Sequence, residues 1–409
     1  MKTFPLENVA QLPVWRRPIA FLVLTAIALP IAFATWLALV NNFVIEVAQF
    51  DGADIGLLHS VREIPGFLAV GVIAILLFVR EQILGLVSLV LLAVSTAVTA
   101  YFPTLGGILM ITFLSSVGFH YFETVNQSLQ LQWIRKDRAP KVLGILGAVG
   151  SAATLVSYGL IVLLWEPLNL TYNTVFMVSG GVAVLIGLYC FVGFPQFENN
   201  VVQRRELVLR KRYWLYYALE FFAGARRQVF VVFAGFMLVE RFGFDVHEVT
   251  GLYIINLVAN IILAPFFGGL VARFGERRML LIEYFGLVLV FLAYGGIYFF
   301  DWGVWLAMAL YVVDHMLFAL KLALKTYFQK IADPSDIAPT AAVSFTINHI
   351  AAVFLPVLLG LLWIVSPAAV FLTAAGIACG SFVLALLIPR HPEGGFETIW
   401  TRRAPAVAE

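Results

Sequence analysis

Residues 18–41 read PIAFLVLTAIALPIAFATWLALVN, an apolar run that directly follows Arg16 and Arg17. An α-helix rises about 1.5 Å per residue, so a run of this length crosses the roughly 30 Å hydrocarbon core of a bilayer. The run is too long for the apolar part of a signal peptide, and no small-residue cleavage site follows it. We therefore interpret it as a membrane-spanning helix that is not removed.

The composition of the whole chain agrees with this interpretation. Hydrophobic residues make up 62% of the 409 positions, charged residues make up 12%, and the mean hydropathy is +0.95. Soluble domains contain about 45–50% apolar and about 25% charged residues. The composition therefore excludes a cytosolic enzyme, a nucleic-acid-binding protein, a disordered chain and a secreted disulfide scaffold. It predicts an all-α, polytopic membrane protein surrounded by lipid bilayer, with no nucleic-acid partner.

Twelve apolar runs are long enough to cross the membrane and are bounded by charge, Pro, Asn or Gly. They cover residues 18–41, 55–79, 83–102, 106–128, 142–165, 171–194, 213–239, 249–271, 279–300, 302–325, 341–365 and 367–388. Twelve spans place both chain ends on the same side of the membrane.

Positive charge is concentrated on that side. Of the 26 Lys and Arg residues, 22 fall on one face. They lie in the N-terminal segment, at Arg80, in the loop Arg135–Lys141, the linker Arg204–Arg212 and the loop Arg273–Arg278, at the helix-end Lys321, Lys325 and Lys330, and in the tail. Short cytoplasmic loops accumulate Lys and Arg. We therefore expect a multi-pass protein of a bacterial-type inner (plasma) membrane, with both termini cytoplasmic.

The sequence also repeats itself at an offset of 195 residues. Gly56-Leu57 corresponds to Gly251-Leu252, and His120 corresponds to His315. Such self-similarity indicates two related bundles. The predicted domains are residues 1–195, a cytoplasmic linker at 196–212, and residues 213–409 with a short cytoplasmic tail.

The loop between spans eight and nine reads GGLVARFGERR, from Gly268 to Arg278. With six plus six spans, internal termini and a basic linker, this loop resembles the major facilitator superfamily, whose loop signature is approximately GxLxDRxGRR. Ala272 stands where an Asp is usual. The resemblance covers nearly the whole chain. It implies two pseudo-symmetric six-helix bundles that alternate access to a central site, and a gating role for Gly268, Arg273, Gly275 and Arg277.

Ionisable residues inside spans are costly unless they face protein or water, which makes them candidates for function. The deep residues are Arg62, Glu63, His120, Glu123, Glu220, Arg226, Arg227, Asp314, His315 and His349. Lys321 and Lys325 lie near a predicted span end, where their side chains can reach the interface. The family resemblance implies that spans one, four, seven and ten line the central cavity.

The predicted substrate contacts are polar or aromatic side chains on those four spans: Arg226, Arg227, Gln228, His120, Asn126, Trp36 and His315. Arg226 and Arg227 lie about 100° apart on a helix, so one can instead pair with an acid on another span. Trp36 can serve either as packing or as a stacking platform. Glu123 and Asp314 are the predicted proton-coupling residues, with a permanent salt bridge as the alternative.

Four further polar residues, Arg62, Glu63, Asn348 and His349, lie on spans that meet across the bundle interface in the resembled family. They are predicted to be gating contacts rather than ligands. The His and carboxylate pairs also permit a metal cargo, which the two arginines at similar depth disfavour. No phosphate-cradling loop, nucleophile elbow or extended Cys/His array is present, so neither enzyme chemistry, a cofactor nor a resident metal is expected.

The leading hypothesis is a secondary transporter that acts as a monomer and moves a small organic anion or zwitterion together with protons. Midplane arginines suit such a cargo. A proton-driven exporter of lipophilic cations or drugs is the first alternative, because carboxylates in an aromatic-rich cavity would serve it equally well. A non-transporting membrane scaffold or assembly factor on the same fold is the second.

Overall fold

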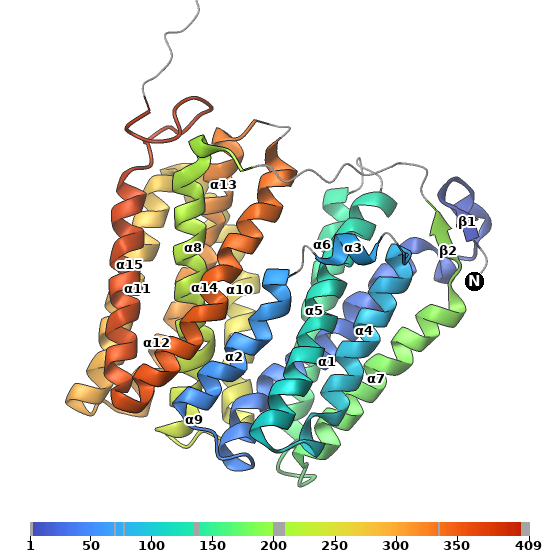
Figure 1. The fold of residues 1–409 in the computed structure, drawn as a ribbon, viewed down its shortest axis with the longest axis horizontal. Helices are drawn as coiled ribbons and strands as arrows, with labels where there is room; N and C mark the ends of the chain where they lie inside the picture. Colours follow the sequence, from blue (N-terminus) through green and yellow to red (C-terminus); the bar gives the residue numbers. More distant parts are fainter. Residues whose placement is uncertain are drawn as a thin grey trace, which may run out of the picture. The chain divides into compact units, whose positions relative to one another are not determined.

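The computed structural model describes residues 3–68, 71–76, 78–134, 139–198, 209–333 and 336–401. Helices form nearly all of this part of the chain (Figure 1). It divides into two compact units. Unit 1 comprises Met1–Phe50, Val61–Gln203 and Phe244–Ile254, and unit 2 comprises Asp51–Ser60, Arg204–Gly243 and Ile255–Glu409.

Six α-helices of the described residues lie wholly in unit 1: α1 (Pro18–Glu46), α3 (Gly71–Ile75), α4 (Glu81–Val98), α5 (Leu105–Trp133), α6 (Ala139–Leu164) and α7 (Tyr172–Gly193). Local sequence determines several of their starts. Pro18 occupies the first turn of α1, where its missing N–H costs nothing. Thr104 caps α5 by accepting a hydrogen bond from the Gly107 N–H at 3.2 Å.

Small residues and aromatic rings hold unit 1 together. A Cβ at Gly180 of α7 would overlap the carbonyl oxygen of Ala93 on α4, so only glycine permits this approach of the two helices. Phe21 packs edge-on against Trp133, with ring centroids 5.4 Å apart, and against Phe194 at 5.5 Å.

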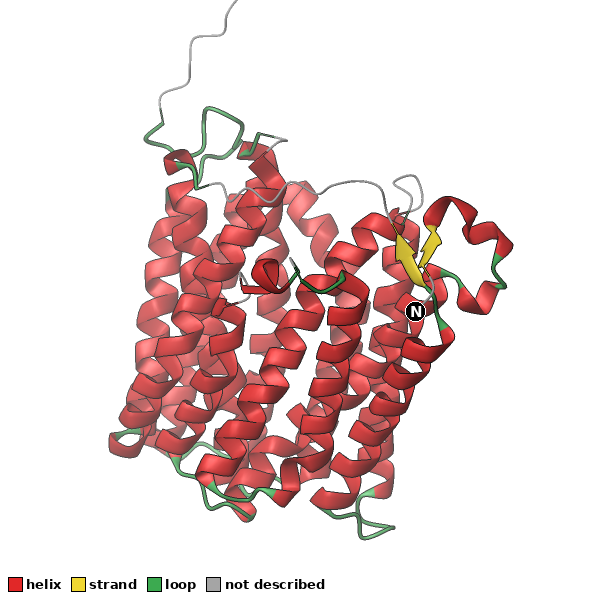
Figure 2. Cartoon of the chain, turned by 45° about the vertical axis from the view of Figure 1, so that its right-hand side comes forward, coloured by secondary structure: helices red, strands yellow, loops and turns green. Residues whose placement is uncertain are grey.

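A two-stranded parallel sheet lies beside the N-terminus (Figure 2). Strand β1 (Thr3–Pro5) pairs with β2 (Gln196–Glu198), with Phe4 opposite Phe197. Gln82 holds β2 to the start of α4, because its amide donates to the Pro195 carbonyl at 2.9 Å and accepts from the Phe197 N–H at 3.0 Å.

Unit 2 contains α8 (Trp214–Gln228), α9 (Gly235–Glu240), α11 (Glu276–Phe300), α12 (Val304–Phe318), α13 (Leu322–Ile331), α14 (Ile337–Val365) and α15 (Pro367–Leu386). A π-helical turn, Val229–Ala234, joins α8 to α9. A 3-10 turn, Ala319–Lys321, joins α12 to α13. Two spans of this unit therefore change helical geometry partway along, a feature that often accompanies a functional site.

Two helices are divided between the units. The first part of α2 (Gly52–Phe67) groups with unit 2, and the first part of α10 (Val246–Phe274) groups with unit 1. The predicted halves 1–195 and 213–409 do not include this exchange. Residues 199–208 of the predicted linker lie outside the described part, as do Arg135, Lys136 and Arg138 of the basic loop, and the division into halves stays a prediction.

Among the described residues, eleven helices are long and apolar enough to cross a membrane, and they correspond to eleven of the twelve predicted spans. The remaining span, 55–79, contains α2 and α3, with residues 69–70 and 77 outside the described part. Alone, α2 has 16 residues and includes Pro65. The structure therefore supports the predicted count of twelve approximately and the all-α membrane fold directly.

Candidate functional site

The functional candidates of unit 2 are centred on Arg226, near the end of α8. Its side chain is 2% exposed. Nη2 lies 3.4 Å from Oε1 of Glu283 on α11, and Nη1 donates to Oγ of Ser381 on α15. The guanidinium also lies 4.3 Å from the ring centroid of Tyr284. Arg226 therefore has an ion-pair partner and a cation–π contact inside the unit.

Glu283 was absent from the deep charges chosen from the sequence. It lies one turn inside the predicted span 279–300 and is fully buried. A residue only one turn from a predicted span end does not stand out as deep in the membrane. Any carboxylate inside a predicted span is nevertheless a signal of function. Adding Glu283 changes the charge balance around Arg226, because the arginine now has an acid partner on a neighbouring helix.

A second ion pair involves Glu220, which lies on α8 six residues before Arg226. Lys321 Nζ lies 3.2 Å from Oε2 of Glu220, and the Asn348 amide donates to the Glu220 carbonyl at 3.1 Å and to Oε2 at 3.3 Å. Its position near a predicted span end predicts that the Lys321 side chain reaches the interface. Instead its ammonium binds a buried carboxylate, because the 3-10 turn at Ala319–Lys321 places it beside α8.

Close packing of α8 and α14 supports this pair. A Cβ at Gly224 of α8 would overlap the backbone carbonyl of Asn348 on α14. The glycine lets the two helix backbones approach, which brings the Asn348 amide within reach of Glu220. His349, the next residue, makes a local contact instead, since its Nδ1 lies 2.8 Å from the Phe345 carbonyl and its ring packs on Phe345.

Asp314 on α12 is a further buried acid of unit 2. It is 2% exposed, and its Oδ2 has no hydrogen-bond partner among the described residues. The Tyr294 hydroxyl on α11 is likewise buried with no hydrogen-bond partner among the described residues. Gln228, at the end of α8, is fully buried, and within the described part neither of its amide atoms has a partner. Such groups are rare in native cores and require an explanation.

Span seven and span ten touch beside these groups. The ring of Phe230, in the π-helical turn, lies 4.8 Å from that of Tyr311 and 6.0 Å from that of His315. His315 is half-buried, as is Arg227. Of the predicted residues, unit 2 therefore places Arg226, Arg227, Gln228, Asp314 and His315 on two adjoining spans with irregular turns.

Unit 1 contains the other predicted residues. His120 is buried on α5, and Glu123, half-buried on the same helix, hydrogen-bonds with Gln127. Asn126 is also half-buried. Trp36 is 3% exposed on α1, and its indole N–H has no partner in the described structure.

The predicted gating residues come from several elements. Arg62 Nη2 lies 2.7 Å from Oε1 of its neighbour Glu63, and Ser116 Oγ donates to the Arg62 carbonyl. Asn348 belongs to the Glu220 pair. Arg273, Gly275 and Arg277 line a polar cavity of about 580 Å³ at the connection from α10 to α11, and Gly268 lies in α10 outside its lining.

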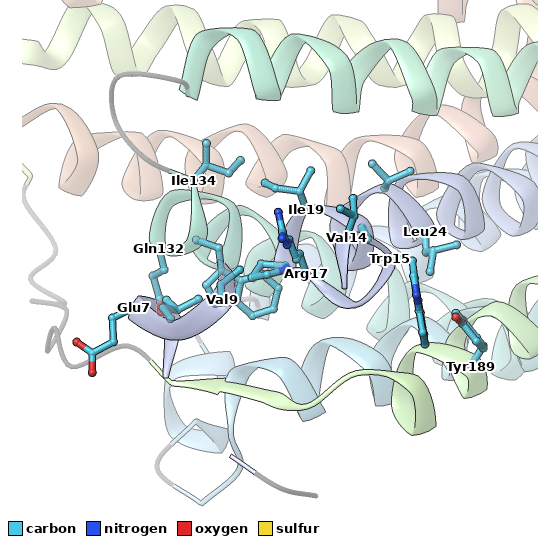
Figure 3. Close-up of a pocket in the computed structure, with 15 residues that line it drawn as sticks. Glu7, Val9, Val14, Trp15, Arg17, Ile19, Leu24, Gln132, Ile134 and Tyr189 are labelled. Carbon is cyan, nitrogen blue, oxygen red and sulfur yellow. The ribbon is translucent and has the colours of Figure 1, made fainter. Parts of the chain in front are cut away.

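A cavity of about 1020 Å³ belongs to unit 1 and has mainly apolar walls. The N-terminal segment lines it together with Gln132, Trp133, Ile134 and Tyr189 (Figure 3). Trp15 and Tyr189 lie together at one end, while the Glu7 carboxylate points away from the other labelled side chains. None of the predicted substrate contacts lines it, so we do not place the cargo there.

Comparisons with known proteins agree with the fold. Residues 18–338 match the family model described as Major Facilitator Superfamily. No curated protein matches the sequence.

Solved structures of transporters resemble the chain over most of its length. The nucleoside transporter NupG (D323A mutant) aligns with a TM-score of 0.74 at 14% identity, covering 90% of this chain and 99% of its own. A POT family transporter in complex with a thioalcohol-conjugated peptide gives 0.69 at 11% identity, covering 90% and 94%. A bacterial homolog of the human lysosomal transporter Spinster gives 0.65 at 12% identity, covering 90% and 93%.

Proposed function

The chain belongs to the Major Facilitator Superfamily and is a multi-pass membrane transporter, not an enzyme, and from this premise we propose that it moves a small organic anion or zwitterion by alternating access, coupled to protons. The observation that carries the proposal is the pairing pattern in unit 2. Arg226 and Lys321 are bound to carboxylates, whereas Oδ2 of the buried Asp314 has no hydrogen-bond partner in the described structure.

Asp314 is the proposed proton carrier. An ionised carboxylate without a partner is costly in a low-dielectric interior, and a protonated one costs much less. Exposure to water on one side of the membrane lets the group release its proton, and burial favours taking one up. A cycle that alternately buries and exposes Asp314 therefore moves a proton. Glu123 of unit 1 is the second candidate carrier.

The proposed cargo contacts are Arg227, Gln228 and His315. Arg226 already binds Glu283, so we assign it the task of holding α8, α11 and α15 together. Arg227 is the next residue, half-buried, and can offer the planar N–H donors that suit a carboxylate or phosphate. The amide of Gln228, unpartnered within the described part, and the His315 ring supply further hydrogen bonds. His120 and Asn126 are the corresponding proposals on unit 1.

One observation favours the cation exporter as the second candidate. Tyr311 lies three residues before Asp314 on α12, and its ring packs on that of Phe230 with centroids 4.8 Å apart. A carboxylate beside aromatic faces suits a lipophilic cation. The cargo assays below therefore include such cations.

The gating and orientation proposals rest on the remaining contacts. We propose that the Arg62–Glu63 pair and the connection containing Gly268, Arg273, Gly275 and Arg277 change contacts during transport, and that Asn348 and His349 position α14. The excess of cations at that connection and at the N-terminal segment supports an inner-membrane protein with cytoplasmic termini. We propose that it acts as a monomer.

The test uses the full chain in liposomes that contain a pH-sensitive dye. Pooled organic anions and zwitterions are added first, and pooled lipophilic cations are added separately. Asp314→Asn is expected to abolish proton flux while cargo exchange between the two sides persists. Arg227→Gln is expected to reduce anion uptake by at least about tenfold, since it removes a charge-assisted hydrogen bond.

Matched controls come from the far end of the same unit. Asp301→Asn and Arg241→Gln make the same chemical changes in a pair whose Asp301 side chain is 95% exposed, and both should transport normally. Proton flux that persists in Asp314→Asn contradicts the assigned carrier. Flux driven by the cation pool alone contradicts the anion assignment and favours the exporter.

A further inference from the structure

A polar cavity of unit 2 lies away from the proposed cargo residues, where α10 ends and α11 begins. Its volume is about 580 Å³. Residues at the ends of three segments line it: Ala272, Arg273, Phe274, Gly275, Glu276, Arg277, Arg278, Leu281, Lys330, Arg390 and His391. Five of these side chains are cationic at neutral pH, and one is a carboxylate.

The carboxylate does not neutralise the arginines. Glu276 is 3% exposed, and its Oε1 lies 2.8 Å from Lys330 Nζ, so these two charges satisfy each other. Arg277, Arg278 and Arg390 form no hydrogen bond or ion pair with any described residue. The Arg273 guanidinium lies 5.2 Å from the ring centroid of Phe274 and likewise has no described carboxylate partner. Four guanidinium groups thus surround one cavity without a described counter-ion.

The backbone adds to this positive potential. The 25-residue helix α11 begins at Glu276, immediately after Gly275, whose φ of 82° turns the chain into the helix. The first turn of a helix carries unsatisfied N–H groups and the positive end of the helix dipole. Ala272 lines the same cavity, at the position where the loop signature usually has an Asp, so this loop lacks the acid that would lower its charge.

We propose that this basic cavity binds an anion that carries a phosphate group, either the headgroup of an anionic phospholipid or a soluble phosphate ester. Guanidinium groups match phosphate oxygens in charge and in planar hydrogen-bond geometry. A cavity of this volume holds a glycerol phosphate unit. Basic pockets at the membrane surface are suited to lipid headgroups. The site is distinct from the cargo site, and neither proposal depends on the other.

The experiment measures phosphate binding by the full chain in detergent. Native mass spectrometry counts phosphatidylglycerol adducts, with phosphatidylcholine as the lipid whose headgroup has no net charge. Isothermal titration with glycerol 3-phosphate measures the soluble ester. The test variant is Arg273→Gln with Arg390→Gln. The matched control is Lys211→Gln with Lys325→Gln, which removes two exposed cations of the same unit outside the cavity lining.

The test variant should lose about tenfold or more in affinity for the phosphate anion, and the control should bind as the unmodified chain does. Loss confined to phosphatidylglycerol identifies a lipid headgroup as the ligand, and loss of glycerol 3-phosphate binding identifies a soluble ester. The proposal is overturned if neither phosphate binds, if both variants lose binding equally, or if phosphatidylcholine binds as tightly as phosphatidylglycerol. The helical signal in far-UV circular dichroism, together with size-exclusion chromatography, checks that each variant folds.

Discussion

Arg226 and Glu283 form an ion pair across two helices, with Nη2 and Oε1 3.4 Å apart and side chains only 2% and 1% exposed. The pair joins α8 to α11, and the hydrogen bond to Ser381 extends it to α15. Removing one member of a buried pair is strongly destabilising, because the remaining charge is buried away from solvent and has no counter-ion. It also removes Arg226 from the groups that can readily bind a cargo.

Replacing one member of this pair should destabilise the protein more than replacing both. Arg226→Met or Glu283→Leu alone leaves a buried charge and should lower the free energy of unfolding by about 3–5 kcal/mol. The double variant should recover a large part of the loss. Chemical unfolding in detergent, followed by circular dichroism, measures all three. Additive losses in the double variant would contradict the pairing.

The second pair makes a separate prediction. Lys321→Met removes the cation that binds Glu220 and should lower the free energy of unfolding by about 1–3 kcal/mol, because a buried carboxylate loses a charged hydrogen-bond partner. Lys325→Met changes an exposed lysine on the same helical segment and serves as the control. Equal unfolding midpoints for the two variants would show that Lys321 reaches the interface, as its position near a predicted span end indicates.

Alanine should have opposite effects at two helical glycines, one in the contact between α8 and α14 and one with open space around it. Gly224→Ala places a methyl group against the Asn348 carbonyl and should destabilise the protein by about 1–3 kcal/mol, the typical effect of overpacking. Gly376→Ala on α15 has open space around it and should stabilise the helix by about 0.5–1 kcal/mol. Thermal unfolding of both variants in one detergent checks the difference. Two shifts of the same sign would contradict the packing described here.

Apolar runs and charge distribution predicted most of the fold, because lipid leaves the backbone few alternatives to helices. Span 55–79 was the exception. It contains Pro65 and the charges Arg62 and Glu63, and in the structure it includes the two shorter helices α2 and α3. The π-helical turn after Gln228 and the 3-10 turn before Leu322 were also beyond sequence reasoning, because neither has a compositional signal.

The candidate site was only partly predictable. Residue type and depth selected Arg226 and Asp314, and both are buried. Partner choice depends on which helices pack together, which periodicity does not determine. Glu283 and Ser381 therefore emerged as partners of Arg226 only from the structure. The prediction for Lys321 was wrong, because a position near a predicted span end carries no information about the carboxylate of Glu220 on α8.

The connection before α14 predicts a pH dependence outside the membrane spans. Arg210 Nε donates to Asp336 Oδ2 at 3.1 Å, and the Tyr213 hydroxyl donates to the same oxygen at 3.1 Å. The hydrogen bond from Arg210 is the main reason why the pKa of Asp336 lies below its ordinary value, and the same pair raises the pKa of Arg210. A carboxyl with a lowered folded-state pKa stabilises the fold above its unfolded pKa of about 3.9.

That stabilisation should disappear as pH falls through the folded-state pKa of Asp336, because the protonated carboxyl no longer attracts Arg210. Asp336→Asn should therefore unfold at a lower temperature than the unmodified chain at pH 6–7, and the difference should shrink below about pH 4. Thermal unfolding in detergent between pH 7 and pH 3 measures both curves. Asp301→Asn, which changes an exposed acid, controls for general charge effects. A difference that stays constant down to pH 3 would mean that Asp336 is not held ionised by Arg210.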